Sequence, residues 1–476
     1  MAFNLVRNSR VFFTTNVDST TGNVLGTGFL TTNTQEIQVL DGFTFSQNTN
    51  AETITLSEAG DTPVRGQRAF NTSLAPVDFA MSTYLRPSLS GSTVNCEESV
   101  LWNALLGTEK IGTKYTVGGV SGATYSSSTG KVTIAGTLTG TSGIAVGDKL
   151  TIAGLGGTGA TSANTSGTVT AISGSAIDVK LDSAPASSLT LTAPTTIYLH
   201  KGAWVAHSNY SAASSGTSDK NQLQKFGMIF VVDSVVYVVD NCALTQATVD
   251  FGLDAISMVA WTGQGTRLRQ IGDTAFGTGS TVSITDNSGD SSGLAGSANG
   301  KNTAANYITN KLSTVTLVSG IDGLVGGSAG TEYNVALTGG SITFNNNISY
   351  LTPANLGVVN LPITYFTATR AVSGTLNAYL RTGAGVSGTG ALLNDLLASA
   401  ATAIDPKFAL NVAIGGKNNT VRVELDMAGA MISIPTVDVQ QVVSTTINFT
   451  AQGHDIIGDT YDISTPNELV VRYYSA

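Results

Sequence analysis

The chain has 476 residues, of which 12% are charged and 54 are glycine, and its formal net charge is −9. Stable nucleic-acid binding needs clustered basic residues, and the 23 lysines and arginines here are scattered, so a nucleic-acid-binding protein is not expected. The low share of charged residues favours a β-rich fold of strands and turns, with surfaces that neighbouring subunits cover.

Cysteine usage and the N-terminal residues indicate folding in a reducing cytoplasm. Cys96 and Cys242 are too few for a disulfide framework and lack the spacing of metal ligands. Residues 1–15 include Arg7 and Arg10 and no continuous apolar stretch, unlike a secretory signal. No apolar run approaches the ~20 residues that cross a bilayer, so we expect a soluble chain or assembly with no membrane partner.

The first element with a clear pattern is a short helix. Glu97 and Glu98 would place negative charge in its first turn, where the helix dipole favours it. Apolar residues with helical spacing follow them, namely Val100, Leu101, Leu105 and Leu106. We expect this helix to pack against a β domain.

Residues 113–224 differ in sequence pattern from the residues on either side. Short runs rich in β-branched residues lie at 131–134, 149–152, 168–172 and 177–181, and glycine and serine separate them. Regular short strands with turn signals predict a small sandwich, such as an Ig-like domain, or a small barrel. We expect it to be inserted in the surrounding domain and to project from it.

Residues 229–261 predict four long strands, and the third strand alternates in polarity. Its apolar face carries Ala243, Thr245, Ala247, Val249, Phe251 and Leu253. Its wet face carries Gln246, Thr248, Asp250 and Asp254. Beyond it, residues 272–306 and 319–330 are rich in glycine, serine, threonine and aspartate without periodicity, which is typical of linkers and loops.

Short motifs of the first part of the chain recur, in the same order, in the second part. The pairs are Tyr84-Leu85-Arg86 with Tyr379-Leu380-Arg381, Trp102-Asn103-Ala104-Leu105-Leu106 with Leu393-Asn394-Asp395-Leu396-Leu397, Phe226-Gly227-Met228 with Phe408-Ala409-Leu410, Thr248-Val249-Asp250 with Thr436-Val437-Asp438, and Trp261-Thr262-Gly263-Gln264-Gly265 with Phe449-Thr450-Ala451-Gln452-Gly453. Between the second and third motifs the first copy carries 109 extra residues, which is where the inserted domain would lie.

The repeat predicts two tandem β domains, each with a flanking helix. The first would span residues 1–112 and 225–272, the insert 113–224, a linker or contact arm 273–306, and the second domain 307–476. The second helix would run from Ala391 to about Ala401, and the second wet face would carry Thr436, Asp438 and Gln440, opposite Val437 and Val439. Two modules on one chain are typical of a component that occupies two positions of a symmetric ring, although a duplicated barrel or sandwich in a monomer fits the repetition equally well.

No catalytic or metal-binding pattern stands out. The glycine motif at 383–388 lies between a strand and a helix, as in a dinucleotide site, but its duplicate position has no matching glycines, and the motif at 154–159 precedes no expected helix, so both indicate turns. The histidines, His200, His207 and His454, lack zinc-site spacing, and the oxygen-rich loop 286–290 lacks the glutamate of an EF-hand. We expect a protein without cofactor or metal that is not an enzyme.

A further set of motifs surrounds the first copy of the repeat. It consists of Leu56-Ser57-Glu58-Ala59-Gly60, Arg65-Gly66, Phe70-Asn71, Leu74-Ala75-Pro76 to Tyr84-Leu85-Arg86-Pro87, and Leu244 to Trp261-Thr262-Gly263. Together with the repeat, these motifs resemble the tail tube protein of tailed bacteriophages over about three-quarters of the chain, the insert excluded. The resemblance implies a β-sandwich flanked by a helix and a long loop, with six such domains in each ring of a hollow tube through which DNA passes.

The usual member of this family supplies one domain, whereas this chain would supply two, as in some long-tailed siphophages. Three chains would then complete a pseudo-sixfold ring, with the inserted domain projecting outward. Partners would be further copies of the chain, other tail proteins such as the tape measure, the terminator and the baseplate or tip, and DNA in passage. The protein would be assembled in the host cytoplasm and would reside in the virion tail.

The channel is the expected location of the wet faces, because polar and acidic side chains keep DNA phosphates at a distance. The tube exterior is the alternative location.

Two other protein classes are alternatives to a tail tube protein. A surface-layer or adhesin protein shares the composition but needs an export signal, and a secreted β-solenoid hydrolase or lyase needs a short repeat and paired carboxylates.

Overall fold

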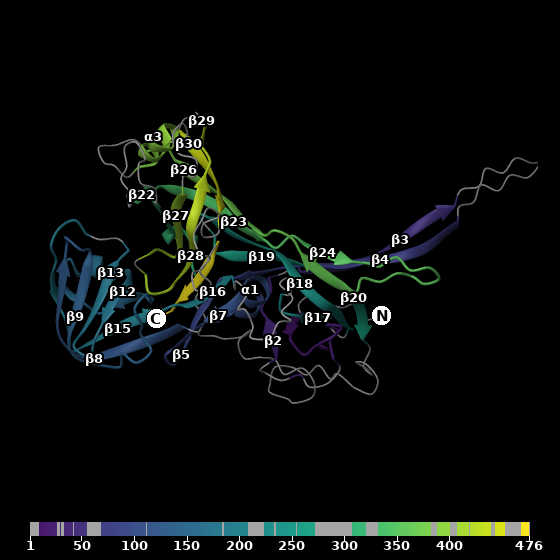
Figure 1. Cartoon of the computed structure of the whole chain (residues 1–476), viewed down its shortest axis with the longest axis horizontal. Helices are drawn as coiled ribbons and strands as arrows, with labels where there is room; N and C mark the ends of the chain where they lie inside the picture. Colours follow the sequence, from purple (N-terminus) through teal and green to yellow (C-terminus); the bar gives the residue numbers. More distant parts are fainter. Residues whose placement is uncertain are drawn as a thin grey trace, which may run out of the picture.

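The fold is mainly β, as expected: one large antiparallel sheet forms most of the body, and a smaller closed barrel lies at one end (Figure 1). The structure, a computed structural model, describes residues 9–25, 29, 33–40, 42–54, 68–110, 112–182, 185–207, 223–232, 235–253, 255–271, 307–319, 332–381, 388–399, 407–417, 419–438, 443–452 and 468–475. The predicted linker 272–306 and nearly all of the predicted loop 319–330 lie outside these residues.

The first part of the chain supplies a row of antiparallel strands. Their spatial order is β2 (Thr34–Ile37), β1 (Arg10–Thr14), β17 (Phe226–Val232), β18 (Val235–Gly252), β19 (Met258–Gly265), β4 (Arg68–Tyr84) and β3 (Thr44–Ile54). In addition, β20 (Arg267–Ile271) pairs with the first half of β18. The long hairpin β3–β4 projects from the body on the side away from the barrel (Figure 1).

The second part of the chain supplies a row with the same pairing order. It runs β22 (Glu332–Val335), β21 (Thr314–Ser319), β27 (Lys407–Ile414), β28 (Arg422–Ile432), β30 (Ser444–Ala451), β26 (Ala371–Tyr379) and β23 (Leu337–Asn345). β31 (Val470–Tyr474) pairs with the first half of β28, as β20 does with β18. β29 (Thr436–Asp438) follows β28 and pairs with β30, so β28 and β29 together correspond to β18.

An irregularity recurs at the same place in the two rows. β17 shifts register between Phe226 and Met228, and β27 shifts register between Phe408 and Leu410. A β-bulge is a specific local feature, so its recurrence at residues that the internal sequence comparison equates supports that equivalence.

The strand pairing corrects another equivalence by two residues. Phe79 of β4 lies opposite Gly263 of β19, whereas Gly374 of β26 lies opposite Phe449 of β30. An added Cβ at either glycine would collide with the facing phenylalanine ring, so ring and glycine have exchanged strands between the rows. Phe449 therefore corresponds to Gly263, and its sequence-based match to Trp261 is wrong, because the connection from β29 to β30 is two residues shorter than the one from β18 to β19.

Residues 112–201 contain the barrel. Six strands close it in the order β8 (Gly112–Ser126), β9 (Lys131–Thr139), β13 (Ala176–Leu181), β12 (Ser166–Ile172), β10 (Lys149–Ala153) and β15 (Thr196–Lys201), and β15 pairs back to β8. Apolar side chains of these strands form a separate core. The hairpin of β5 (Pro87–Ser90) and β6 (Thr93–Cys96) pairs with the start of β8. Of the predicted alternatives, the structure has the barrel.

The chain leaves the barrel before residue 224. β16 (Ala203–His207) pairs with β7 (Gly107–Lys110) and with β31, so it belongs to the large sheet. Within the sequence that forms the barrel, β11 (Gly156–Thr158) pairs with β14 (Thr190–Thr192) as a separate two-stranded sheet, and the short helix α2 (Ala160–Ala163) follows β11. The glycine motif at 154–159 therefore does precede a helix, although a helix of one turn, contrary to the sequence-based expectation.

Two longer helices cover the rows of strands. α1 (Ser99–Leu106) presses Trp102 edge-on against Trp261, with the ring centroids 4.7 Å apart. α3 (Thr389–Ser399) begins two residues before the predicted start. The expectation for Glu97 and Glu98 is wrong: they precede α1 and are only 5% and 2% exposed, so they are buried carboxyl groups rather than surface charges of its first turn.

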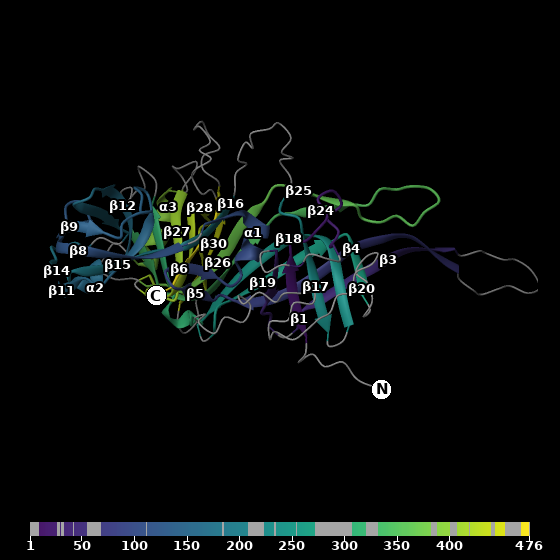
Figure 2. The same ribbon diagram turned by 90° about the horizontal axis from the view of Figure 1, so that it is seen from below.

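A second arm accompanies the hairpin β3–β4. It comprises β24 (Ile348–Leu351), β25 (Thr364–Thr367) and their connection, which runs alongside the first hairpin (Figure 2). The backbone N–H of Leu74 donates to the carbonyl of Asn360, 2.9 Å away, and this contact ties the two arms together. The short 3-10 helix η3 (Asn310–Leu312) precedes β21.

Candidate channel-facing surface

The two rows join edge to edge into one continuous sheet. β18 pairs with β23 in antiparallel register, which gives the strand order β3–β4–β19–β18–β23–β26–β30–β29. Directly paired residues point to the same face of a sheet. The register connects Thr248 to Thr343, Thr343 to Ser373 and Ser373 to Thr450, so these side chains share one face.

This shared face is polar, and the opposite face is buried. Its polar members, which we call the polar face, are Thr44, Ser46, Asp78, Ser82, Gln246, Thr248, Asp250, Thr262, Gln264, Ser341, Thr343, Asn345, Ser373, Thr375, Asn377, Thr436, Asp438, Ser444, Thr446, Asn448 and Thr450. The opposite side carries core residues such as Phe79, Trp261, Val249, Phe344 and Leu376. Period-two alternation therefore extends over eight strands.

The structure brings the five described residues of the two predicted wet faces onto this one surface. Gln246 and Thr248 are half-buried, and Asp250, Thr436 and Asp438 are exposed. The other two predicted residues, Asp254 and Gln440, lie outside the described residues, as does Val439.

Two residues predicted for the dry side are exposed in the chain. Leu253 is 46% exposed, so its assignment to the core is wrong, because it follows the end of β18. Val437 is 37% exposed, whereas its counterpart Val249 is 2% exposed. Val249 is covered because β18 has neighbours on both sides, while β29 pairs only with β30 among the described residues.

Sequence reasoning missed the rest of the polar face. β4 alternates buried Val77, Phe79 and Met81 with the less buried Asp78, Ala80 and Ser82. The same period-two signal was present in the sequence there. Only the strand register shows that β4, β23, β26 and β30 contribute to the same surface as β18.

Short polar side chains on this face bond to one another. Gln264 Nε2 donates to Asp78 Oδ1 at 2.8 Å, and Gln246 Nε2 donates to the hydroxyl of Thr248 at 3.0 Å. The hydroxyls of Thr248 and Thr343 lie 3.1 Å apart across the junction of the two rows. These contacts satisfy the side chains locally, and none of them involves a cation.

The charged residues among the polar-face members named above are all negative; Arg68, opposite Ile54 in the projecting part of the hairpin β3–β4, lies outside that set. Asp78, Asp250 and Asp438 are the charged members of the set, and it contains neither lysine nor arginine. A surface of this kind repels phosphate groups, because it offers negative potential and no ion-pair partner.

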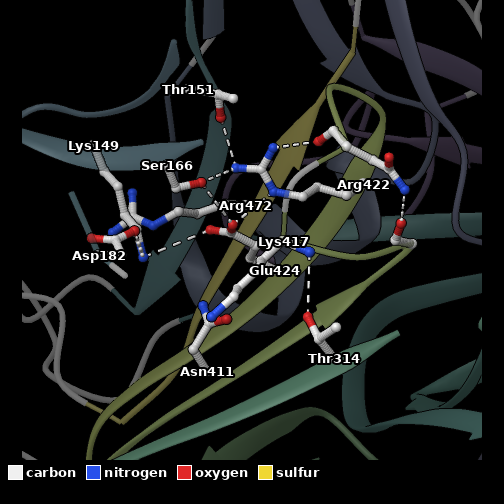
Figure 3. A network of polar contacts seen from close by, with 12 residues as sticks. Lys149, Thr151, Ser166, Asp182, Thr314, Asn411, Lys417, Arg422, Glu424 and Arg472 are labelled. Atoms are coloured by element: carbon white, nitrogen blue, oxygen red, sulfur yellow. Dashed lines mark hydrogen bonds and ion pairs between the residues drawn. The ribbon is translucent and has the colours of Figure 1, made fainter. Parts of the chain in front are cut away.

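A different polar cluster lies between the barrel and the second row (Figure 3). Lys149 Nζ, on β10, lies 3.4 Å from Asp426 and 3.7 Å from Glu424, both on β28, and 3.5 Å from Asp182. Arg422 Nε donates to Glu424 at 2.7 Å, and Arg472 Nε donates to Asp426 at 2.7 Å. We call these three cations and three carboxylates the ionic cluster.

The ionic cluster fixes the barrel against the second row. Fully buried Arg422 donates across the junction to Thr151 Oγ1 at 2.7 Å and also bonds to Ser166. Burial opposes ionisation of Asp426, but Lys149 and Arg472 lower its pKa to about 2. A cavity of about 390 Å³ adjoins the cluster. Because its charges balance, the arrangement suits a docking contact better than a site for a charged ligand.

The histidines and the loop and glycine motifs of the sequence do not form a binding or catalytic site among the described residues. Burial, with Lys114 and Arg422 nearby, lowers the pKa of His200 to about 4, so the ring is neutral where its Nδ1 meets the carbonyl of Ser475, 3.2 Å away. The described residues contain no cluster of histidine, cysteine and carboxylate side chains suited to a metal. The loop 286–290, His454 and most of the glycine motif 383–388 lie outside them. None of the described helices is both long enough and apolar enough to cross a bilayer.

Comparison with known proteins agrees with the resemblance seen in the sequence. The chain is 25% identical over 487 residues to the tail tube protein pb6 of Escherichia phage T5, and the match covers 99% of this chain and 79% of that protein. No family model matches the chain. A chain of the six-fold symmetrised baseplate of the anti-feeding prophage overlaps 29% of this chain and 88% of its own length at 11% identity, with a TM-score of 0.23, which is too low to support an argument. The similarity to a phage tail tube protein is thus confirmed, and it extends beyond the predicted three-quarters to nearly the whole chain.

Proposed function

We propose that this chain, similar from end to end to a phage tail tube protein, is a structural component of a bacteriophage tail tube. It would assemble into rings, and the rings would stack into a hollow tube. The observation that carries the proposal is the antiparallel pairing of β18 with β23. This pairing joins one edge of the first row to a different edge of the second, equivalent row. Contacts of this heterologous kind repeat, and they close into a ring when the rotation between modules allows it.

Ring size follows from the number of modules that each chain supplies. With two rows of strands per chain, three chains give six modules and a trimer with pseudo-sixfold symmetry. Six chains would give twelve modules, twice the number that the family resemblance implies. We therefore favour the trimer over the hexamer.

The polar face would line the channel. Its three aspartates and its lack of cations at the described register positions keep phosphates from binding, so DNA would slide rather than adhere. The opposite face carries the apolar core and cannot face water. The barrel, attached at the far side of the second row, would project outward.

Other partners follow from the same role. A tube must meet a tape measure inside it, a terminator at one end and a tip or baseplate at the other, so we propose contacts with tail proteins of these kinds. The chain would be assembled in the bacterial host and remain in the virion. A surface-layer or adhesin protein stays the alternative.

Electron microscopy of the purified protein tests this role. We expect stacked rings with a central pore, and averaged end views with six strong densities of which alternate ones carry the barrel. Flat lattices would favour the surface-layer alternative. Monomers without pores over a range of concentrations would contradict the proposal.

A further inference from the structure

Two strands of the continuous sheet pair on one side only among the described residues. β29 pairs with β30, and β3 pairs with β4. Their counterparts β18 and β23 pair on both sides and form the junction between the two rows. The order of strands places β29 and β3 at the two ends of the sheet, well apart in Figure 1, so they do not meet within one chain.

The internal junction provides a register. In it, Thr248 lies opposite Thr343, Val249 opposite Ile342, and Asp250 opposite Ser341. The equivalents of these residues follow from the strand pairing, not from sequence alone.

The equivalents on β29 are given by its partner strand. Thr248 lies opposite Ala260 of β19, and Thr436 lies opposite Thr446 of β30. Thr436, Val437 and Asp438 thus stand where Thr248, Val249 and Asp250 stand in the first row.

The equivalents on β3 are given through β4. Phe79 and Gly374 are equivalent, because each lies opposite its partner in the exchanged pair of phenylalanine and glycine. The residues that precede them, Asp78 and Ser373, are therefore equivalent as well. Asp78 lies opposite Ser46, and Ser373 lies opposite Thr343. Ser46, Phe45 and Thr44 therefore correspond to Thr343, Ile342 and Ser341.

We propose that β29 of one chain pairs antiparallel with β3 of a second copy, with Thr436 opposite Ser46, Val437 opposite Phe45, and Asp438 opposite Thr44. This rests on the proposed ring and names the residues that close it. The contact between chains would repeat, in register, the contact within each chain.

The side chains at the proposed contact match those of the internal junction. A hydroxyl faces a hydroxyl, an aspartate faces a hydroxyl, and an aliphatic side chain faces a larger apolar one, as they do for Thr248, Asp250 and Val249. Such directly opposed pairs set strand register.

Exposure supports the same contact. Val437 is 37% exposed, against 2% for Val249, and pairing with a second copy would cover it. Phe45 is already partly held, with its ring stacked on Phe230 at a centroid distance of 4.8 Å, so it presents a fixed apolar surface. A second copy paired at both edges would also cover strand edges of the kind that invite aggregation.

Cysteine cross-linking tests the register. Opposed residues in an antiparallel pair have Cβ atoms about 4.5–5.5 Å apart, close enough for mild oxidation to link some of them. One variant carries Thr436→Cys with Ser46→Cys, and another carries Asp438→Cys with Thr44→Cys. In assembled tubes we expect at least one of them to give linked chains on a denaturing gel, with bands up to three chains if the ring is a trimer.

Controls separate the register from the wider function. The shifted pairs Thr436→Cys with Thr44→Cys, and Asp438→Cys with Ser46→Cys, should link at least several-fold less. In the variant Thr248→Cys with Thr343→Cys, the two cysteines lie opposite each other within one chain. Oxidation should therefore form a disulfide inside the chain without linking it to a second chain. The native Cys96 and Cys242 are buried and provide the background. If tubes form but the shifted pairs link better, or no pair links, the proposed contact is wrong while the tube role stands; absence of tubes from the unaltered chain would instead refute the role itself.

Discussion

At the scale of single residues, the unusual groups are the buried carboxyls ahead of α1. Glu98 Oε1 accepts a hydrogen bond from the backbone N–H of Arg86 at 3.0 Å, while its Oε2 has no hydrogen-bond partner within the described part of the chain. Burial raises the pKa of Glu98 from 4.5 to about 7, and it raises the pKa of Glu97 to about 8, despite the nearby Arg86. The fold therefore favours the protonated forms.

This predicts stability that falls as pH rises. A carboxyl whose pKa is raised in the folded state stabilises the fold fully below pH 4.5, and this contribution is lost between pH 4.5 and about 8. Glu98→Gln mimics the protonated form. We expect it to stabilise the protein at pH 8 by roughly 1–3 kcal/mol relative to its effect at pH 5. Urea unfolding of the unassembled chain at both values measures this.

The matched control is Glu52→Gln on the exposed part of β3. It changes the net charge equally but leaves the buried carboxyls in place, so the pH dependence of unfolding should stay as in the unaltered chain. An equal pH slope in Glu98→Gln and the unaltered chain would show that Glu98 is ionised throughout.

At the scale of elements, the barrel is inserted in the first part of the chain but docks on the second. Its strands β10 and β12 meet β28 through the ionic cluster, and β16, which follows the barrel, pairs with β31. The barrel therefore braces the two rows of one chain together, in addition to projecting from them.

Removing one cation of the cluster should loosen this docking. Lys149→Met leaves Asp426 and Glu424 buried with fewer counter-charges, at a cost on the order of 3–5 kcal/mol. The barrel core does not include Lys149, so the barrel should stay folded while amide exchange accelerates in β10, β28 and β31. Hydrogen exchange with mass spectrometry measures both regions in one experiment.

Two variants control for a general loss of stability. Lys180→Met removes an exposed lysine of the same barrel and should leave exchange at the junction unchanged. Adding Asp182→Asn to Lys149→Met removes the one carboxylate left in excess, keeps the Arg422–Glu424 and Arg472–Asp426 pairs, and should restore part of the protection. Junction protection in Lys149→Met equal to that of the unaltered chain would mean that the ionic cluster does not hold the barrel.

At the scale of the whole molecule, the polar face is a property of the joined rows. Neither row alone carries it across eight strands, and neither carries all of its aspartates. Its proposed place in the channel makes its charge, rather than any one side chain, the quantity that matters for DNA.

Reversing that charge should slow DNA passage. Asp250→Lys with Asp438→Lys puts cations where phosphates would pass, and each added contact strengthens DNA binding, most at low salt. We expect tubes of normal appearance that retain DNA, and virions that eject DNA at least several-fold more slowly at low salt. Fluorescence of DNA released from purified virions gives the rate.

The comparison needs charge added elsewhere. Lysines at the exposed barrel residues Ser127 and Thr129 should leave ejection unchanged, and Asp250→Asn with Asp438→Asn should have a smaller effect than the lysines. Normal ejection by the double lysine variant at low salt would place the polar face outside the channel.

Local periodicity was sufficient for much of this fold. Alternation in residues 243–253 predicted a strand with one buried face, which is right for Val249 and Phe251 and wrong for Leu253. The recurrence of Thr248-Val249-Asp250 located the equivalent strand in the second part of the chain. The match of Trp261 to Phe449 failed because a shorter connection and an exchange of phenylalanine with glycine preserve packing without preserving the sequence alignment. The prediction for Glu97 and Glu98 was wrong because the charge pattern near a helix does not show whether the side chains are buried.

The sequence by itself determined the β class, the internal repeat, the interruption of the first copy by a further β domain and the resemblance to tail tube proteins, since these depend on side-chain period and motif order along the chain. Only the tertiary structure decided that Thr248 faces Thr343, that eight strands share one polar face, and that Lys149 meets Asp426. Such contacts join residues about a hundred or more positions apart, and strand register, which places them, is set by packing across the sheet rather than by neighbours in sequence.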